Sequence, residues 1–372
     1  MLNENEAFAV LTSIQGLGAL KIRQLVERFG SALAALTATP SAISALPGYE
    51  RIGKTWNAWQ EATTWQQDLA LVAKTGVQLI PFTSPHFPKS LLETPDHPAL
   101  LYVQGTLKSR DTHSIAIVGT RNASIYGSEM AETIGRDLAA NGFTVISGLA
   151  RGIDTSAHRG ALDKGRTIAV IGSGLADIYP PENEHLAKHI LKDGALISEF
   201  PMCTPPDRQN FPQRNRIVSG MTLATLLIEA PIRSGAMITM EKAFMQKRKL
   251  FALPGRADNE NFRGNHALIK SGRATLVENS DDIISHFEEL FPRIQPQTFD
   301  NQCFYLDNQE QRLLEIMSFE EIGIDALSSL SNHPIYQTQT ILMGLVLKKA
   351  IKEFPGKIYK KITAGNGKIR HN

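Results

Sequence analysis

The stretch SIAIVGTRNASIYG, residues 114–127, decides the fold: a short apolar run ends at a glycine, and a helix-length segment follows. Similar short, β-branched and apolar runs recur as FTVIS (143–147), TIAVI (167–171), ALISEF (195–200), LATLLIE (223–229) and KLFAL (249–253). Helix-length segments separate most of them, at 127–141, 155–164 and 236–247. Apolar strands that alternate with helices predict a parallel sheet covered on both faces. Six such strands predict an α/β fold with a Rossmann-like, doubly wound, mostly parallel sheet.

Two regions precede these strands along the chain. Residues 1–70 are predicted to be helical, because apolar residues follow the Gly16-Leu17-Gly18 turn at helical spacing. This pattern favours a small helix-hairpin-helix (SAM-like) domain, in which a helix N-terminus is able to hold a DNA phosphate. A plain helical packing module is the alternative. Residues 77–110 contain five prolines and are expected to form an extended connector with short strands. We assign this connector and the sheet to one domain, residues 71–290.

The end of the chain predicts a linker and a third domain. Residues 291–308 are polar with two prolines and are predicted to be the linker. Residues 309–372 show three helical patterns and then the strand-like run GKIYKKI, which together predict a winged-helix-like domain. In the third helix, Ile341, Leu342, Leu345 and Val346 are expected to face inward. Residues 348–372 contain eight Lys or Arg and one Glu, which is typical either of a solvated end or of contact with an acidic partner or nucleic acid.

Composition excludes several classes of protein. The formal net charge is only +2, so any nucleic-acid surface would have to be a local patch. Cys203 and Cys303 lie far apart and outside any CxxC pair, so the sequence indicates no metal site and fits a reducing, cytoplasmic environment. The first ten residues do not resemble a secretory signal, and no apolar run reaches transmembrane length. We therefore expect a cytoplasmic protein without membrane insertion.

Candidate binding residues follow the predicted strands. Ligands of open α/β sheets bind outside the carboxyl ends of the strands. Glycine and hydroxyl residues recur there and provide backbone donors suited to phosphate. The candidates after the first, second and fifth strands are Gly119, Arg121, Ser147, Gly148, Ser234 and Gly235.

The segment DRQNFPQRNR, residues 207–216, follows the fourth strand and therefore lies at the same edge. Arg208, Arg214 and Arg216 offer forked donors to phosphate oxygens, and Phe211 offers a face for a base. Arginine together with an aromatic ring is typical of proteins that bind single-stranded nucleic acid. The alternative is structural: Arg214 or Arg216 would pair with Glu199 or Glu229, and Phe211 would lie in the core.

Signals for catalysis are weak. The first turn, GTRNASIYG, does not complete a dinucleotide fingerprint, and Walker A and HExxH motifs are absent from the sequence. Ser147 lacks the GxSxG context of a nucleophile, and the spacing of Asp154 and His158 favours a cap with a packed histidine. Glu199 or Glu229 remains possible as a general base. We predict a non-enzyme with no catalytic residue, cofactor or metal.

Two enzyme classes are alternatives to a non-enzyme. A nucleoside-monophosphate phosphoribohydrolase on a related Rossmann-like fold would be expected to contain a PGGxGTxxE-like segment. The corresponding segment here, IRSGAMITMEKA (232–243), lacks the double glycine, although Glu241 follows. A dinucleotide-dependent dehydrogenase is disfavoured by the incomplete fingerprint.

Seven segments occur in order along the chain: IAIVGTRNASIYG, VISGLARGIDTSAHRGAL, TIAVIGSGLADIYPPEN, LISEFP, FPQRNRIVSG, LLIEAPIRSGAMIT and FALPG…GNHALI. This ordered set resembles the DNA-processing protein A family (DprA, also called Smf). The resemblance is dense over residues 77–275 and looser in the flanking regions. It implies a single-stranded DNA-binding protein that is not an enzyme. It also implies protection of incoming strands in natural transformation, loading of the RecA recombinase, and a homodimer formed through the Rossmann-like domain.

The resemblance also implies specific pocket residues: Arg121 of the GTR motif, and Arg208 and Phe211 before RNR. One departure concerns YPPENEH, where many family members carry a basic residue after YP. This chain has Pro181 and Glu182 there, so that phosphate contact is expected to be absent or supplied elsewhere. The winged-helix-like domain binds DNA in some members and serves other contacts in others, so its role stays open.

Overall fold

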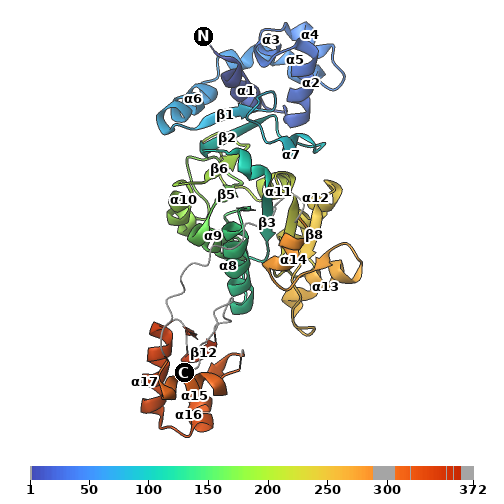
Figure 1. The fold of residues 1–372 in the computed structure, drawn as a ribbon. Helices are drawn as coiled ribbons and strands as arrows, with labels where there is room; N and C mark the ends of the chain where they lie inside the picture. The colour runs from blue at the N-terminus through green and yellow to red at the C-terminus, as the bar shows by residue number, and fades with distance from the viewer. Residues whose placement is uncertain (1, 288–305, 319, 349, 355, 362–372) are drawn as a thin grey trace. The chain divides into compact units, whose positions relative to one another are not determined.

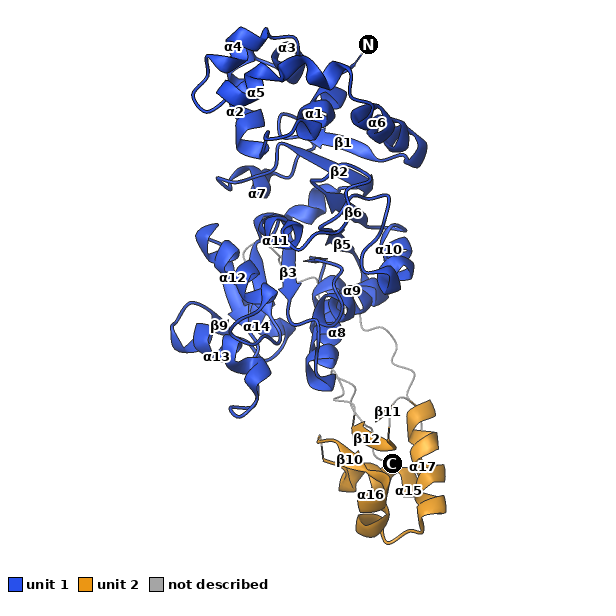
Figure 2. Cartoon of the chain, turned by 180° about the vertical axis from the view of Figure 1, so that it is seen from behind, with its two compact units in different colours: residues 1–293 blue, residues 294–372 orange. Residues whose placement is uncertain are grey.

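The computed structural model describes residues 2–287, 306–318, 320–348, 350–354 and 356–361. The chain divides into two compact units, residues 1–293 and residues 294–372 (Figure 2). The predicted linker lies largely outside the described residues. The predicted domain boundaries near residues 70 and 290 stay predictions. The helices before residue 70 share one compact unit with the sheet.

In the described part of unit 1, nine strands form one sheet (Figure 1). They are β1 (Gln78–Pro81), β2 (Leu100–Gly105), β3 (Ser114–Val118), β4 (Thr144–Ser147), β5 (Thr167–Val170), β6 (Ala195–Ser198), β7 (Ala224–Leu227), β8 (Lys249–Ala252) and β9 (Thr275–Leu276). Their order is β1-β2-β6-β5-β4-β3-β7-β8-β9. The seven neighbouring strands β6-β5-β4-β3-β7-β8-β9 are parallel to one another. Strand β2 is antiparallel to both of its neighbours, β1 and β6. The predicted Rossmann-like, mostly parallel fold is confirmed.

Alternation along each strand supplies two cores, one on each face of the sheet. Ile115 and Ile117 of β3 lie in the core with α8 (Ile125–Ala140), α9 (Ile153–Lys164) and α14 (Ser280–Ser285). Ala116 and Val118 lie in the core with α11 (Asn210–Gly220), α12 (Gly235–Met245) and α13 (Arg263–Lys270). The remaining elements around the sheet are α7 (Lys89–Leu92), α10 (Glu184–Ile190) and the short 3-10 helices Ser109–Thr112, Pro181–Asn183 and Glu260–Phe262. Every central strand is therefore apolar on both sides, which is why its sequence reads as a continuous apolar run.

The N-terminal region is helical, as the sequence predicts. Its elements are α1 (Glu4–Ser13), α2 (Ala19–Phe29), α3 (Ala32–Leu36), α4 (Pro40–Ser44), α5 (Glu50–Lys54), a 3-10 helix (Trp56–Gln60) and α6 (Thr64–Thr75). Gly16 has a φ of +87°, which glycine tolerates best, and it makes the tight turn between α1 and α2. The Tyr102 hydroxyl and the Met202 N–H donate to the Asp68 carboxylate at 2.8 and 2.5 Å. These bonds tie α6 to the sheet and to the segment after β6.

Unit 2 has the order of elements of a winged-helix-like unit, which agrees with the prediction. The elements are α15 (Asn308–Ile316), β10 (Ile322–Gly323), α16 (Ile324–Ser331), α17 (Ile335–Leu347), β11 (Ile351–Phe354) and β12 (Ile358–Lys361). The strands form an antiparallel sheet in the order β10-β12-β11. Ile341, Leu342 and Leu345 lie in its core, and Val346 packs against that core, as expected. Across the described residues of both units, no helix is long and apolar enough to span a membrane.

Candidate functional site

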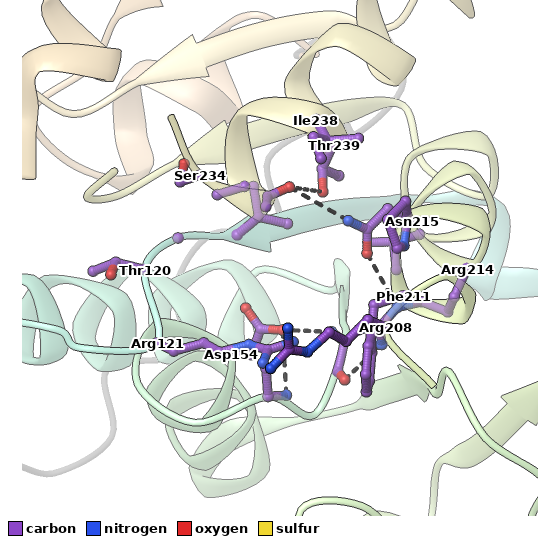
Figure 3. Close-up of a pocket in the computed structure, with 18 of the residues that line it drawn as sticks. Thr120, Arg121, Asp154, Arg208, Phe211, Arg214, Asn215, Ser234, Ile238 and Thr239 are labelled. Carbon is purple, nitrogen blue, oxygen red and sulfur yellow. Dashed lines mark hydrogen bonds between the residues drawn. The ribbon is translucent and has the colours of Figure 1, made fainter. Parts of the chain in front are cut away.

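The sheet reverses its winding direction between β3 and β7. Strands β4, β5 and β6 follow on one side of β3, and β7, β8 and β9 follow on the other. At such a switch point the loops leave in opposite directions and open a crevice at the carboxyl ends of the strands. A pocket of about 720 Å³ lies there, lined by residues that follow five different strands. We call it the switch-point pocket (Figure 3).

The lining combines cations, an aromatic pair and a helix start. Figure 3 shows Arg121, Arg208 and Phe211 gathered on one side of the pocket, with Ser234 and Thr239 across from them. The complete lining is Val118, Gly119, Thr120, Arg121, Gly148, Ala150, Asp154, Tyr179, Pro206, Arg208, Phe211, Pro212, Arg214, Asn215, Val218, Ser234, Gly235, Ala236, Ile238 and Thr239. The structure thus brings together eight of the ten predicted residues, all except Ser147 and Arg216.

Arg121 and Arg208 are the exposed cations of the switch-point pocket. Neither forms an ion pair with any of the described residues. The guanidinium carbon of Arg121 lies 5.0 Å from the centroid of the Phe211 ring, which is the distance of a cation–π contact. Both side chains therefore have donors available for an anion that enters the pocket.

The Phe211 ring is half-buried and is held from behind. A Cβ atom at Gly172 would lie 2.8 Å from Phe211 Cδ1, so only glycine fits in the turn after β5. The rings of Phe211 and Tyr179 lie 5.7 Å apart at 46°. The sequence analysis does not single out Tyr179, because it considers only the absence of a cation after YP. The sequence feature that could have identified Tyr179 is an aromatic residue in the loop after a central strand.

Arg214 forms the floor of the pocket. It is 4% exposed, and its Nη1 donates to the carbonyl oxygens of Gly148, at 2.6 Å, and of Val170. Burial lowers the pKa of Arg214 to about 10, an effect that the nearby Asp154 carboxylate opposes. The guanidinium therefore stays charged at neutral pH. Of the two predicted alternatives the structural one fits better, although the partners are carbonyl groups and Asp154 rather than Glu199 or Glu229.

Asp154 and Gly148 explain how this floor is kept in place. Asp154 accepts hydrogen bonds from the N–H groups of Gly148 and Ala150 at 3.1 and 3.4 Å. Burial raises the pKa of its carboxyl, and Arg214 pulls the pKa back down. A Cβ atom at Gly148 would lie 2.5 Å from Arg214 Nη1, so this position requires glycine. The Gly148 N–H donates to Asp154 and is therefore not available to a phosphate, so Gly148 contributes to the shape of the pocket.

Two predicted binding residues lie outside the pocket. Ser147 is fully buried, and its hydroxyl donates to the carbonyl oxygen of Ile117 at 2.7 Å. Arg216 forms an ion pair with Glu199 at 2.5 Å, and both side chains are almost completely buried. Ser147 therefore does not face the pocket, contrary to expectation, whereas the pair of Arg216 with Glu199 agrees with the structural alternative that the sequence leaves open. Glu229, the other acid of that alternative, accepts hydrogen bonds from the N–H and hydroxyl of Ser124 at 3.0 and 2.7 Å.

The remaining predicted residues shape the rim. Ser234 caps α12, because its hydroxyl accepts a hydrogen bond from the Met237 N–H at 3.3 Å. Gly235 is exposed, and a Cβ atom there would meet nothing within 4 Å. Gly119 is a packing glycine, since a Cβ atom would lie 2.5 Å from Ile153 Cγ1. The positive end of the α12 dipole therefore opens onto the same pocket as Arg121 and Arg208.

The segment after Tyr179 brings no cation into the pocket, as the sequence leads us to expect. Pro181 and Glu182 begin a short 3-10 helix, and neither lines the pocket. Glu182 forms an exposed ion pair with Arg151. No cation from this segment lines the pocket, and Arg121 and Arg208 are the exposed cations in the lining.

Comparison with known proteins shows the family of the chain. The family model of DNA recombination-mediator protein A matches residues 78–288, more than half of the chain. The chain belongs to this family. Protein Smf of Escherichia coli is 37% identical over 298 residues, covering 78% of this chain and 79% of that protein. DNA processing protein DprA of Bacillus subtilis is 39% identical over 225 residues, covering 60% of this chain and 74% of that protein.

Two solved structures of family members are similar to this chain. DprA of Streptococcus pneumoniae superposes with a TM-score of 0.65 at 31% identity, covering 77% of this chain and 99% of that one. DNA processing protein A of Helicobacter pylori superposes with a TM-score of 0.53 at 30% identity, covering 58% of this chain and 99% of that one. The latter structure was described for its single-stranded DNA binding mode. The family model covers residues 78–288, which include the sheet that forms the switch-point pocket.

Proposed function

We propose that this chain binds single-stranded DNA in the switch-point pocket and acts on it without catalysis. The observation that carries the proposal is the placement of two exposed arginines, Arg121 and Arg208, around the half-exposed ring of Phe211. Guanidinium groups bind phosphates, and an aromatic face stacks with a base. A base offers its face only when it is unpaired and unstacked, so this combination favours a single strand over a duplex.

The size and chemistry of the pocket support this reading. Its volume of about 720 Å³ falls within the range of small-ligand pockets, so it admits a nucleotide but not a duplex. The N-terminus of α12 adds a dipole that attracts phosphate. Tyr179 lies beside Phe211 and is 37% exposed, so we expect it to extend the stacking surface to a neighbouring base.

We further propose the role that family membership implies. The chain would protect the bound strand and help load a RecA recombinase onto it, in natural transformation or homologous recombination. It would act in the cytoplasm as a homodimer formed through the sheet-bearing unit. Support for these points comes from the family match and from the relatives named DNA processing protein.

A nucleotide-processing enzyme is the weaker candidate. Asp154 is the only acidic residue in the pocket lining, and its carboxylate is buried and accepts two backbone hydrogen bonds. Glu241, the acid of the phosphoribohydrolase-like segment, pairs with Arg273 at 2.5 Å and does not line the pocket. Incubation with AMP tests this alternative, since release of free base would contradict the non-enzyme proposal.

A salt series tests the proposed function. Fluorescence anisotropy with a labelled oligo-dT measures affinity for the wild type and for Arg121→Ala and Arg208→Ala. We expect the affinity to fall steeply with salt, and each substitution to lower the logarithmic salt slope by about 0.7, the value for one phosphate on a single strand. Arg159→Ala is the matched control, because Arg159 is an exposed arginine that does not line the pocket. The pocket assignment fails if both pocket variants bind as tightly as the control.

A further inference from the structure

Glu229 is a buried acid that the proposed DNA site does not use directly. It follows the end of β7, its side chain is fully buried, and it does not line the switch-point pocket. Among the described residues no cation pairs with it, and its Oε1 atom has no hydrogen-bond partner. A carboxylate buried without a cation costs free energy. Its presence at this position therefore calls for a reason other than core packing.

Glu229 holds both ends of the loop that carries Arg121. At the start of this loop, the Thr120 N–H donates to the main-chain carbonyl oxygen of Glu229 at 2.7 Å. At its end, the N–H and hydroxyl of Ser124 donate to the Oε2 atom of Glu229 at 3.0 and 2.7 Å. Only residues 121–123 lie between the two anchors. One residue of β7's exit thus determines where the segment that contains Arg121 leaves the sheet and where it joins α8.

The first turn of α8 makes room for the Glu229 carboxylate. A Cβ atom at Gly127 would collide with Oε2 of Glu229, so this position requires glycine. The helix has a cap without Glu229, because the Ser124 hydroxyl accepts a hydrogen bond from the Gly127 N–H at 3.0 Å. The positive end of the α8 dipole offsets part of the cost of burying the carboxylate. Glu229 therefore acts on the position of the cap residue rather than as the cap itself.

The other side of the loop is held by main-chain groups. The Ile153 N–H donates to the carbonyl oxygen of Thr120 at 3.2 Å. A Cβ atom at Gly152 would collide with the carbonyl oxygen of Thr120 and lie 2.6 Å from that of Arg121, so the start of α9 packs closely against the loop. These backbone contacts persist in side-chain variants. The bonds from Ser124 to the Glu229 carboxylate are therefore the link that a substitution is able to remove.

We propose that Glu229 is the positioning residue for Arg121. Its carboxylate holds the loop of residues 119–124 where the Arg121 guanidinium reaches the Phe211 ring, at 5.0 Å from the ring centroid, and a phosphate bound beside that ring. This inference rests on the proposed function, in which Arg121 binds DNA. Because Glu229 does not line the pocket, loss of its side-chain bonds should change DNA binding only through Arg121.

A double-variant cycle with labelled oligo-dT tests this role in the full chain. Glu229→Met removes the acceptor for Ser124, and we expect the affinity to fall about three- to tenfold, less than for the loss of a charge-assisted hydrogen bond. Glu229→Gln keeps an oxygen that accepts from Ser124 and should restore most of the affinity. Glu229→Met should cause no further loss in an Arg121→Ala background but the full loss in an Arg208→Ala background. An equal loss in both backgrounds would indicate a general distortion and overturn the proposal.

Ser124→Ala breaks the same link from the other side and should also lower the affinity only while Arg121 is present. Ser31→Ala is the matched control, because the Ser31 hydroxyl also caps a helix, accepting from the Ala34 N–H at 3.0 Å at the start of α3. It should leave the affinity unchanged.

Hydrogen exchange of the peptide 119–128 follows the loop without DNA. Exchange should be faster in Glu229→Met than in the wild type. Unchanged exchange, or unchanged oligo-dT affinity, in Glu229→Met would overturn this inference and leave the proposed function standing. If Arg121→Ala itself bound oligo-dT as tightly as the wild type, the assignment of Arg121 to DNA would fail, and this inference with it.

Discussion

The guanidinium of Arg121 covers the ring of Phe211, with 5.0 Å between the guanidinium carbon and the ring centroid. The ring is packed against Gly172 behind it and lies beside Tyr179. A base that stacks on Phe211 therefore meets Arg121 first. We infer that binding exchanges a cation–π contact for base stacking and frees the guanidinium of Arg121 to bind a phosphate.

The first prediction concerns the stacking surface. Phe211→Ala should weaken oligo-dT binding by about 5- to 160-fold, which corresponds to the roughly 1–3 kcal/mol of a base–aromatic stack. Phe211→Tyr keeps the ring and should bind within a few-fold of the wild type. Anisotropy titrations at one fixed salt concentration distinguish the two variants. Equal affinity of the alanine and tyrosine variants would show that no base stacks at this position.

The second prediction separates charge from shape at Arg121. Arg121→Lys keeps the positive charge but loses the planar fork and the flat contact with the Phe211 ring. We expect it to keep the salt slope of the wild type while its affinity falls several-fold, whereas Arg121→Ala should lose both. If the lysine variant lost slope as the alanine variant does, Arg121 would not act as a phosphate-binding charge.

The third prediction concerns the pocket floor. Arg214→Met leaves the buried Asp154 carboxylate without its compensating charge, and we expect the free energy of unfolding to fall by about 3–5 kcal/mol. Asp154→Asn in the same chain should restore part of this loss, because its side-chain oxygen still accepts the hydrogen bond that Gly148 donates. Urea unfolding of the single and double variants measures the coupling. Additive losses would show that the two side chains do not stabilise each other.

The pH dependence of this variant follows from the raised pKa of Asp154. Without Arg214 that pKa rises further, so the folded variant binds a proton more readily than the unfolded chain does. A carboxyl whose pKa is raised in the folded state lowers the free energy of unfolding as the pH rises above the pKa of the unfolded chain, about 3.9. The destabilisation caused by Arg214→Met should therefore be smaller at pH 5 than at pH 8. A loss that grew on acidification would contradict this sign.

The fourth prediction concerns His158, which is fully buried and hydrogen-bonded to the Thr167 hydroxyl at 2.7 Å. Burial lowers its pKa to about 3. The unfolded chain therefore takes up a proton below about pH 6.5 that the folded chain rejects, so stability falls as the pH decreases from 6.5. Each pH unit should cost about 1.4 kcal/mol from this group. His158→Gln should flatten the dependence between pH 7 and 5, whereas His86→Gln, at an exposed histidine, should leave it unchanged.

Much of the fold could be predicted because the central strands are buried on both faces. Their apolar runs, such as Ile115 to Val118 of β3, stand out from the helices between them. Strands β1 and β2 were harder to place, since β1 is an edge strand that ends at Pro81 and lies among prolines. The sequence indicates that this region is extended, but it does not show that two strands continue the sheet in antiparallel fashion.

The site could be placed at the correct edge of the sheet, but its members could not all be sorted. Arg214 and Arg216 lie two positions apart on α11, so they point in very different directions from one helix. One enters the pocket floor and the other pairs with Glu199, and only the packing of α11 against the sheet decides which. The prediction for Ser147 fails for a similar reason. Ser147 is the last residue of β4, but its hydroxyl donates to a carbonyl group of the neighbouring strand β3.

The location of the bound strand tests the central claim most directly. An oligonucleotide carrying 5-iododeoxyuridine can be cross-linked to the full chain with light and the attached peptide identified by mass spectrometry. Our account predicts that the cross-links fall on Tyr179, on Phe211 or on residues next to them, and that Phe211→Ala removes those at Phe211. Cross-links confined to the N-terminal helices or to unit 2, with none at the switch-point pocket, would contradict it.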